Sequence, residues 1–148
     1  MTRAWLTTAF VLMLTETAAF GCWQTEQVPV LLHATSLNAL VIDHDKPKKG
    51  AKFELRQAIT FDREEAKLTG AYNQNSLRAA TTDSLGVFSF GEVRQGRYWI
   101  VPAGARSLHD PIAVEVKSPD NKKGARERLK INYFADGCRD LTIDKGNR

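Results

Sequence analysis

Short runs in which apolar and polar residues alternate one by one recur along most of this chain, with turn residues between them. The clearest runs are Phe88–Phe90, Tyr98–Ile100, Ile112–Val116 and Leu129–Tyr133. Successive side chains of an extended strand point to opposite faces, so a period of two predicts strands with one buried and one solvated face. Because such runs follow one another at short intervals, the sequence predicts an all-β fold.

Other β-type runs complete the pattern. They are Val28–Leu32, Ala39–Ile42, Phe53–Ile59, Ala79–Thr82 and Leu141–Ile143. Residues 62–77 show no period, and we interpret them as a long loop or a frayed hairpin, with at most one helical turn over 62–67. No amphipathic helix is available to cross between parallel strands, which argues against a parallel α/β fold. The predicted architecture is a single Greek-key-type β-sandwich of about seven to eight strands.

The first residues have the layout of a secretory signal peptide. Arg3 gives a short positive region, the apolar run Ala4–Leu14 follows, and small and polar residues fill 15–21. The apolar run is shorter than the roughly 20 residues that span a bilayer, so no stable membrane span is predicted. We therefore expect a signal peptide at 1–21 and one β-sandwich domain at 22–148, exported to the periplasm or secreted.

The chain contains two cysteines, Cys22 and Cys138. In an oxidising compartment an even number of cysteines predicts a disulfide. This one would close a loop of more than a hundred residues and stabilise the domain by about 4–5 kcal/mol in the chain-entropy model. Cleavage after Ala19 or after Gly21 fits the signal. The second cut would make Cys22 the N-terminus, and the alternative is then a lipid anchor on Cys22, which would use the same sulfur and give an envelope lipoprotein.

Composition limits the classes of partner. The chain has 148 residues, of which 43% are hydrophobic and 26% charged, as expected for one globular domain. The net charge of +4 is modest, and basic residues are not interleaved with stacking aromatics, so we expect no nucleic-acid partner. A protein or a glycan remains as the expected kind of partner, and no cofactor is expected.

The histidines are the first candidates for chemistry. His44 lies between two aspartates, but neighbours on an extended chain point to opposite faces, so we predict a solvated turn and no metal site. His109 and Asp110 resemble an acid–base pair, and Ser107 is near them in sequence. No nucleophile motif accompanies them, and we predict no catalytic residue.

Aromatic residues are the candidates for a contact surface. Trp99 lies between Tyr98 and Ile100, and if those two face the core, alternation places Trp99 on the outer face. An outward Trp99, together with Tyr72, would offer flat rings to a partner. The alternative is that a neighbouring loop or the N-terminal segment covers Trp99.

Three segments carry a resemblance to a known family. They are Gly50–Leu55, Thr82–Phe90 and Gly96–Val101. In order they give Gly-Ala with hydrophobic alternation, then Thr-Asp-x-x-Gly-x-Phe-x-Phe, then Gly-x-Tyr-x-Ile. This order, from Leu40 to about Val101, resembles the carboxypeptidase regulatory-like, prealbumin-like domain family and the related collagen-adhesin B-type repeats. The resemblance implies a prealbumin-like sandwich, and its motif contains no catalytic residue.

Two relatives of that family would imply chemistry. Collagen-adhesin repeats often hold a Lys–Asn isopeptide bond, but Val41 stands where the lysine is expected. Transthyretin-related hydroxyisourate hydrolases end in Tyr-Arg-Gly-Ser, whereas this chain ends in Asp144-Lys145-Gly146-Asn147-Arg148. We therefore expect a non-catalytic exported module for binding or structural spacing in the cell envelope or outside the cell. The alternative function is a small periplasmic hydrolase of the transthyretin-related type.

Overall fold

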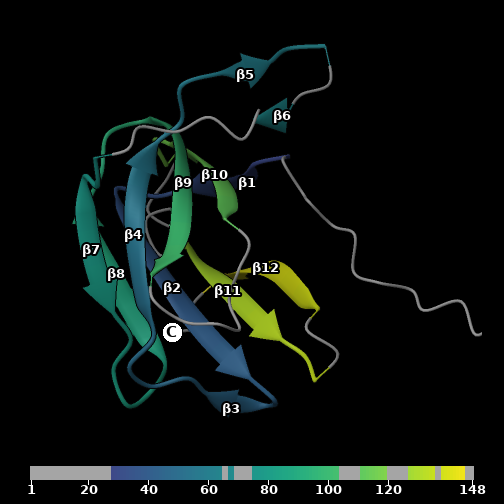
Figure 1. The fold of residues 1–148 in the computed structure, drawn as a ribbon. Helices are drawn as coiled ribbons and strands as arrows, with labels where there is room; N and C mark the ends of the chain where they lie inside the picture. The colour runs from purple at the N-terminus through teal and green to yellow at the C-terminus, as the bar shows by residue number, and fades with distance from the viewer. Residues whose placement is uncertain are drawn as a thin grey trace, which may run out of the picture.

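The computed structural model describes residues 28–64, 67–68, 75–103, 111–119, 127–135 and 138–145. All regular secondary structure in this part of the chain is β-strand, which confirms the predicted all-β class (Figure 1). The strands are β1 (Val30–His33), β2 (Ser36–Asp43), β3 (Lys46–Pro47), β4 (Lys52–Gln57), β5 (Phe61–Asp62), β6 (Lys67–Leu68), β7 (Arg78–Thr81), β8 (Val87–Glu92), β9 (Gly96–Ala103), β10 (Ile112–Lys117), β11 (Glu127–Tyr133) and β12 (Arg139–Lys145).

The predicted signal peptide at 1–21 lies outside the described residues, so the division into signal and domain stays a prediction. Within the ranges given above, no helix has the length and apolar character needed to cross a membrane.

One sheet contains β1, β10, β9, β4 and β7 in that order. Its central pairs are antiparallel, with Ile100 on β9 opposite both Ile112 on β10 and Leu55 on β4. β1 joins one edge in the parallel sense, with Val30 beside Val114. Because directly paired residues point to the same side of a sheet, these apolar residues form one continuous buried face.

The other sheet contains β12, β11 and β2, and the free side of β2 is shared by β8 and β3. β8 pairs with the first part of β2, where Leu40 stands opposite Val87, and β3 pairs with its end, where Asp43 stands opposite Lys46. β2 and β11 are parallel. Among the described strands, β1–β10 and β2–β11 are the parallel pairs, and the strands between them in sequence include strands of both sheets.

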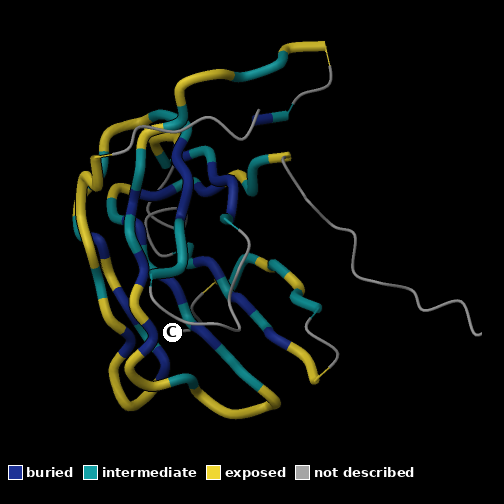
Figure 2. The backbone as a smooth tube through the Cα atoms, viewed as in Figure 1, coloured by how far each residue is buried: buried dark blue, intermediate teal, exposed yellow. Residues whose placement is uncertain are grey.

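The two sheets pack face to face (Figure 1), and buried residues, dark blue in Figure 2, lie along strands of both. The buried apolar residues of the two sheets form one core cluster. Phe88 of β8 stacks on Phe53 of β4 with ring centroids 4.7 Å apart, and meets Phe90 edge-on at 5.1 Å. Fully burying a large apolar side chain contributes about 1.5–3 kcal/mol. The two packed sheets confirm the predicted β-sandwich. Nine of the described strands have four or more residues, slightly more than the seven to eight strands expected.

The Asp83–Gly86 turn carries the chain from β7 in one sheet to β8 in the other. The Asp83 carboxylate accepts hydrogen bonds from two backbone N–H groups of the turn, both at 2.9 Å. Gly86 has a φ of +76°, and a Cβ there would lie 2.5 Å from the carbonyl oxygen of Val41. Only glycine fits this position, because a side chain would meet the backbone of the neighbouring strand.

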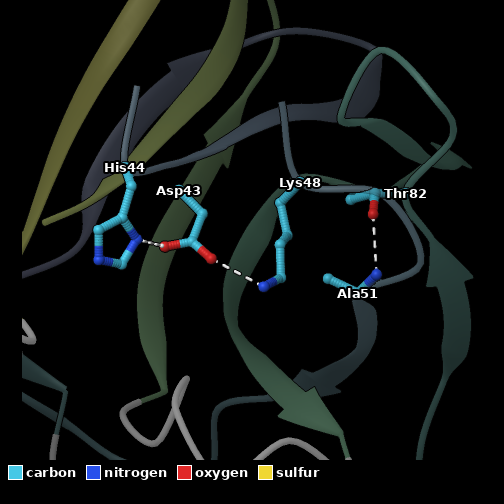
Figure 3. Close-up of polar contacts among 5 residues, drawn as sticks. All are labelled: Asp43, His44, Lys48, Ala51 and Thr82. Carbon is cyan, nitrogen blue, oxygen red and sulfur yellow. Dashed lines mark hydrogen bonds and ion pairs between the residues drawn. The ribbon is translucent and has the colours of Figure 1, made fainter. Parts of the chain in front are cut away.

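Thr82 ties the same turn to the start of β4. Its hydroxyl is buried and accepts a hydrogen bond of 2.9 Å from the backbone N–H of Ala51, as Figure 3 shows. The two residues also bond through their backbones, Thr82 N to Ala51 O at 2.9 Å. The Gly-Ala and Thr-Asp segments of the sequence motif are therefore in contact and have structural roles.

The segment after β4 differs in part from the prediction. Ile59 was expected to continue the strand, but β4 ends at Gln57 and Ile59 is 64% exposed. The last backbone bond to the neighbouring strand is donated by the N–H of Ala58 to the carbonyl of Arg97, and the chain leaves the sheet after it. The following residues form a small hairpin of β5 and β6, as one of the interpretations of 62–77 allowed, and Asp62 is in strand β5 rather than in a helical turn.

Candidate binding pocket

Trp99 lies on the outer side of the first sheet, as alternation predicts, but its ring is covered. It is 3% exposed and packs with Leu68 and Ala113 in a small cluster separate from the main core. Phe61 packs against this cluster. Since Phe61 and Leu68 belong to β5 and β6, the hairpin is the loop that covers the indole. Trp99 therefore offers no open ring, which corrects the expected contact surface, and Tyr72 lies outside the described residues.

Of the two cysteines in the predicted disulfide, the structure describes only Cys138. Cys138 is half-buried and comes directly before β12, and the carbonyl of Cys138 accepts a hydrogen bond of 2.8 Å from the N–H of Phe134. Cys22 lies outside the described residues. The pairing of Cys22 with Cys138, like the lipid anchor on Cys22, stays a prediction.

His44 is in the tight turn between β2 and β3. His44 and Asp45 both have positive φ, 50° and 62°, as the turns that join twisted hairpin strands require. Lys48 Nζ lies 2.7 Å from one Asp43 carboxylate oxygen, and His44 Nδ1 lies 2.6 Å from the other (Figure 3). The hydrogen bond from Lys48 lowers the pKa of Asp43 below its ordinary value, although burial raises it, and His44 lowers it further.

This cluster closes a hairpin and is not arranged as a metal site. The expectation that neighbours would point apart was wrong for His44, because the left-handed turn brings its ring back to Asp43. Among the described residues no group of three or more His, Cys, Asp or Glu side chains could hold a metal ion. His109, Asp110 and Ser107 fall outside the described residues.

A pocket of about 290 Å³ lies between the β5–β6 hairpin and the adjoining ends of β4, β9 and β10. Its lining combines apolar side chains, a guanidinium, a carboxylate, an amide and a hydroxyl. The lining residues are Gln57, Ala58, Ile59, Thr60, Phe61, Leu68, Gly96, Arg97 and Glu115. The accessible lining is mainly polar, so a small ligand in this pocket would be held chiefly by hydrogen bonds.

The Arg97 side chain is held in the pocket by two neighbours. Its guanidinium carbon lies 3.6 Å from the centre of the Phe61 ring, and its Nε lies 3.5 Å from Glu115 Oε2. Lys117 Nζ lies 3.8 Å from the other Glu115 oxygen. Arg97 Nε is buried and has no hydrogen-bond acceptor among the described residues, yet 39% of the side chain is exposed. A ring face and a carboxylate thus hold the guanidinium while leaving it accessible.

Sequence reasoning did not select any of these pocket residues. Alternation does place Arg97 and Glu115 on the outer face, one residue from the inward Tyr98 and Val114. Charged residues on an outer face are usually solvated, so the sequence alone does not indicate that these two form a binding site. The signal that distinguishes them is Phe61, which reaches Arg97 only because the hairpin folds back over the sheet.

Comparison with known proteins adds a distant likeness. No protein-family model matches this chain. No curated protein matches it either. Among solved structures it is similar to the major pilin subunit BcpA of Bacillus cereus, solved as its D312A variant, with 18% sequence identity and a TM-score of 0.41. The likeness covers 68% of this chain and 29% of that one. The prealbumin-like family resemblance therefore stays a prediction, while the β-sandwich is seen directly in the structure.

Proposed function

We propose that this protein is a non-catalytic, exported β-sandwich module that binds a protein or glycan partner. The proposed binding site is the pocket between the β5–β6 hairpin and the first sheet. The observation that carries the proposal is the Arg97 guanidinium, which is stacked on Phe61, paired with Glu115 and still partly exposed. Fixing a polar side chain before a ligand arrives reduces the entropy lost on binding.

The structural roles of the motif residues support a module without catalysis. Thr82, Asp83 and Gly86 are engaged in the turn between the sheets. His44, one of the candidate histidines for a hydrolase, is in the β2–β3 turn and does not line the pocket. The charged side chains of the pocket contact each other, an arrangement suited to holding a ligand.

Export and disulfide closure are part of the proposal. Val30 stands beside Val114 near the start of β10, and Arg139, the residue after Cys138, donates to the carbonyl of Pro111 at the same end of the sandwich. The stretch from Cys22 to Val30 reaches up to about 26 Å when extended. This reach supports a bond between Cys22 and Cys138 in the mature protein.

The test is a titration of the isotope-labelled mature protein with short soluble glycans and with short peptides, followed by amide chemical shifts. We expect shifts concentrated on the residues that line the pocket, with at least one ligand class and without turnover of the ligand. Shifts spread over the surface, or none with either class, would favour a structural spacer. Release of a product from ester or amide substrates would instead support the hydrolase alternative.

A further inference from the structure

The pocket places a donor group and an acceptor group side by side. Arg97 carries five N–H donors and Glu115 carries two acceptor oxygens. Their closest contact, 3.5 Å from Nε to Oε2, is an ion pair at the outer limit of hydrogen-bond distance. Nε itself is buried and donates no hydrogen bond to a described residue. Because 39% of the Arg97 side chain and 21% of the Glu115 side chain are exposed, both groups are positioned and remain accessible to a ligand.

The adjacent opposite charges select against charged ligands. An anion that approached Arg97 would also face the Glu115 carboxylate, and a cation that approached Glu115 would face Arg97 and Lys117. Like charges brought together at a binding site impose a large penalty on the wrong partner. The ligand that satisfies both groups is neutral and offers donors and acceptors on neighbouring atoms, as vicinal hydroxyl groups do.

The rest of the lining fits the same ligand. Ile59, 64% exposed, provides an apolar surface beside the polar groups, and Gln57 adds an amide that both donates and accepts. A volume of about 290 Å³ is at the lower end for small-ligand pockets and suits one ring with its substituents. A sugar ring has this combination of an apolar C–H face and a rim of hydroxyls.

We propose that the pocket binds one neutral monosaccharide unit of a glycan, with hydroxyls that accept from Arg97 and donate to Glu115. This inference rests on the proposed binding function and specifies its ligand. A ring of this size held by few contacts has an expected Kd of about 1 mM for the free sugar.

The experiment compares three small sugars on the full mature protein by amide chemical shifts. The probes are a methyl glycoside of a neutral hexose, the matching uronate and the matching 2-amino sugar. We expect the neutral glycoside to shift the pocket residues at millimolar concentration and the two charged sugars to bind at least about tenfold more weakly.

Variants of the pocket residues test which side chains determine the preference for the neutral sugar. Glu115→Gln keeps the shape and removes the charge, so the uronate is expected to gain about tenfold while the neutral glycoside changes little. Arg97→Lys removes the fork of donors and is expected to weaken the neutral glycoside by about tenfold. Ile59→Ser changes an exposed position, so folding is expected to be unaffected, and the variant is expected to bind the neutral glycoside about threefold more weakly. Arg128→Lys on the opposite sheet, in a pair with Asp144 at 2.6 Å, is the matched control and leaves binding unchanged.

The outcomes separate this inference from the function on which it rests. If the uronate, the amino sugar or a peptide shifts the pocket residues while the neutral glycoside does not, the binding function stands and the assignment of a neutral monosaccharide is overturned. Equal affinity of wild type and Glu115→Gln for the uronate also overturns it. If no probe of either class shifts the pocket residues, both proposals fail.

Discussion

Two glycines show how a single position can be fixed by its surroundings. Gly50 and Gly86 have nearly the same backbone conformation, with φ of +75° and +76°. Around Gly50 nothing would lie within 4 Å of an added Cβ, whereas Gly86 faces the carbonyl of Val41 at 2.5 Å. The pair therefore separates the cost of a left-handed backbone from the cost of a steric clash.

Alanine at these two positions is expected to have unequal effects. Gly50→Ala lowers the free energy of unfolding by about 1–2 kcal/mol, the penalty for a left-handed non-glycine residue. Gly86→Ala lowers it by about 3 kcal/mol or more, because the turn must also move away from β2. Urea unfolding of both variants measures the difference. Equal losses of unfolding free energy in the two variants would show that the turn moves away from Val41 without an energetic cost.

The ion pair of Asp43 predicts a pH dependence. Lys48 lowers the pKa of Asp43 in the folded protein, so the unfolded state binds the proton more readily. This contribution to stability is present above the ordinary pKa of about 4 and is lost as the pH falls from there through the lowered value. Because the pair is partly exposed, it amounts to less than about 1 kcal/mol.

Asp43→Asn removes this dependence and is the variant to compare. Urea unfolding between pH 7 and pH 2.5 is expected to show wild type more stable than Asp43→Asn at neutral pH, with the two curves converging as the pH falls below about 4. Curves that stay parallel over this range would mean that Asp43 titrates alike in both states. Asp45→Asn, in the same turn, controls for the loss of a carboxylate.

At the scale of the element, the β5–β6 hairpin is a cover for the outer face of the first sheet. Leu68 on β6 is fully buried and packs with Trp99. Leu68→Ala removes that packing and is expected to increase quenching of Trp99 fluorescence by acrylamide. The measurement uses the mature protein, without Trp5 of the predicted signal peptide, and a Trp23→Phe background, so that Trp99 is the tryptophan observed. The cost in stability is about 2–5 kcal/mol if the cover stays in place.

Leu77→Ala is the matched control for the hairpin, because Leu77 is 49% exposed at the start of β7. Its quenching and stability are expected to match those of the parent. A Leu68→Ala variant with unchanged quenching would indicate that Phe61 and Ala58 cover the indole without help from β6.

Strand positions could be predicted from the sequence, and strand partners could not. Alternation is a property of neighbouring residues, so it located β8, β9, β10 and β11 and the faces that they bury. Which strand lies beside which depends on residues far apart in the chain. The parallel pair of β2 with β11 brings Ala39 beside Leu129, and no local pattern encodes this contact.

The candidate site could not be predicted from the sequence, for a related reason. Alternation gives the face of Trp99 but not whether another segment covers that face. The hairpin that covers it has two-residue strands, too short to show a period. The pocket then combines Arg97, Glu115 and Phe61 from three separate strands, so its chemistry exists only in the folded protein.

At the scale of the whole molecule, the proposed Cys22–Cys138 bond would join the start of the domain to its last described strand. Replacing both cysteines by serine is expected to lower the free energy of unfolding by about 4–5 kcal/mol, because the bond closes a loop of more than a hundred residues. Intact mass with and without reductant, on protein from its native host, tests the bond itself. Acyl chains on Cys22 with an alkylatable Cys138 would contradict it and indicate a lipid anchor.

Cys138 immediately precedes the last strand, and this position determines how the domain would carry tension. With Cys22 bonded to Cys138, a pull on the two ends of the domain runs through the disulfide and then along β12 alone. An extended strand is already near its full length, at about 3.3 Å per residue. In a single-molecule pulling experiment the oxidised protein is therefore expected to show no long extension step, and the reduced protein one. Oxidised, the sandwich would be an almost inextensible link, whose resistance to stretching depends on one covalent bond and hardly at all on its hydrophobic core.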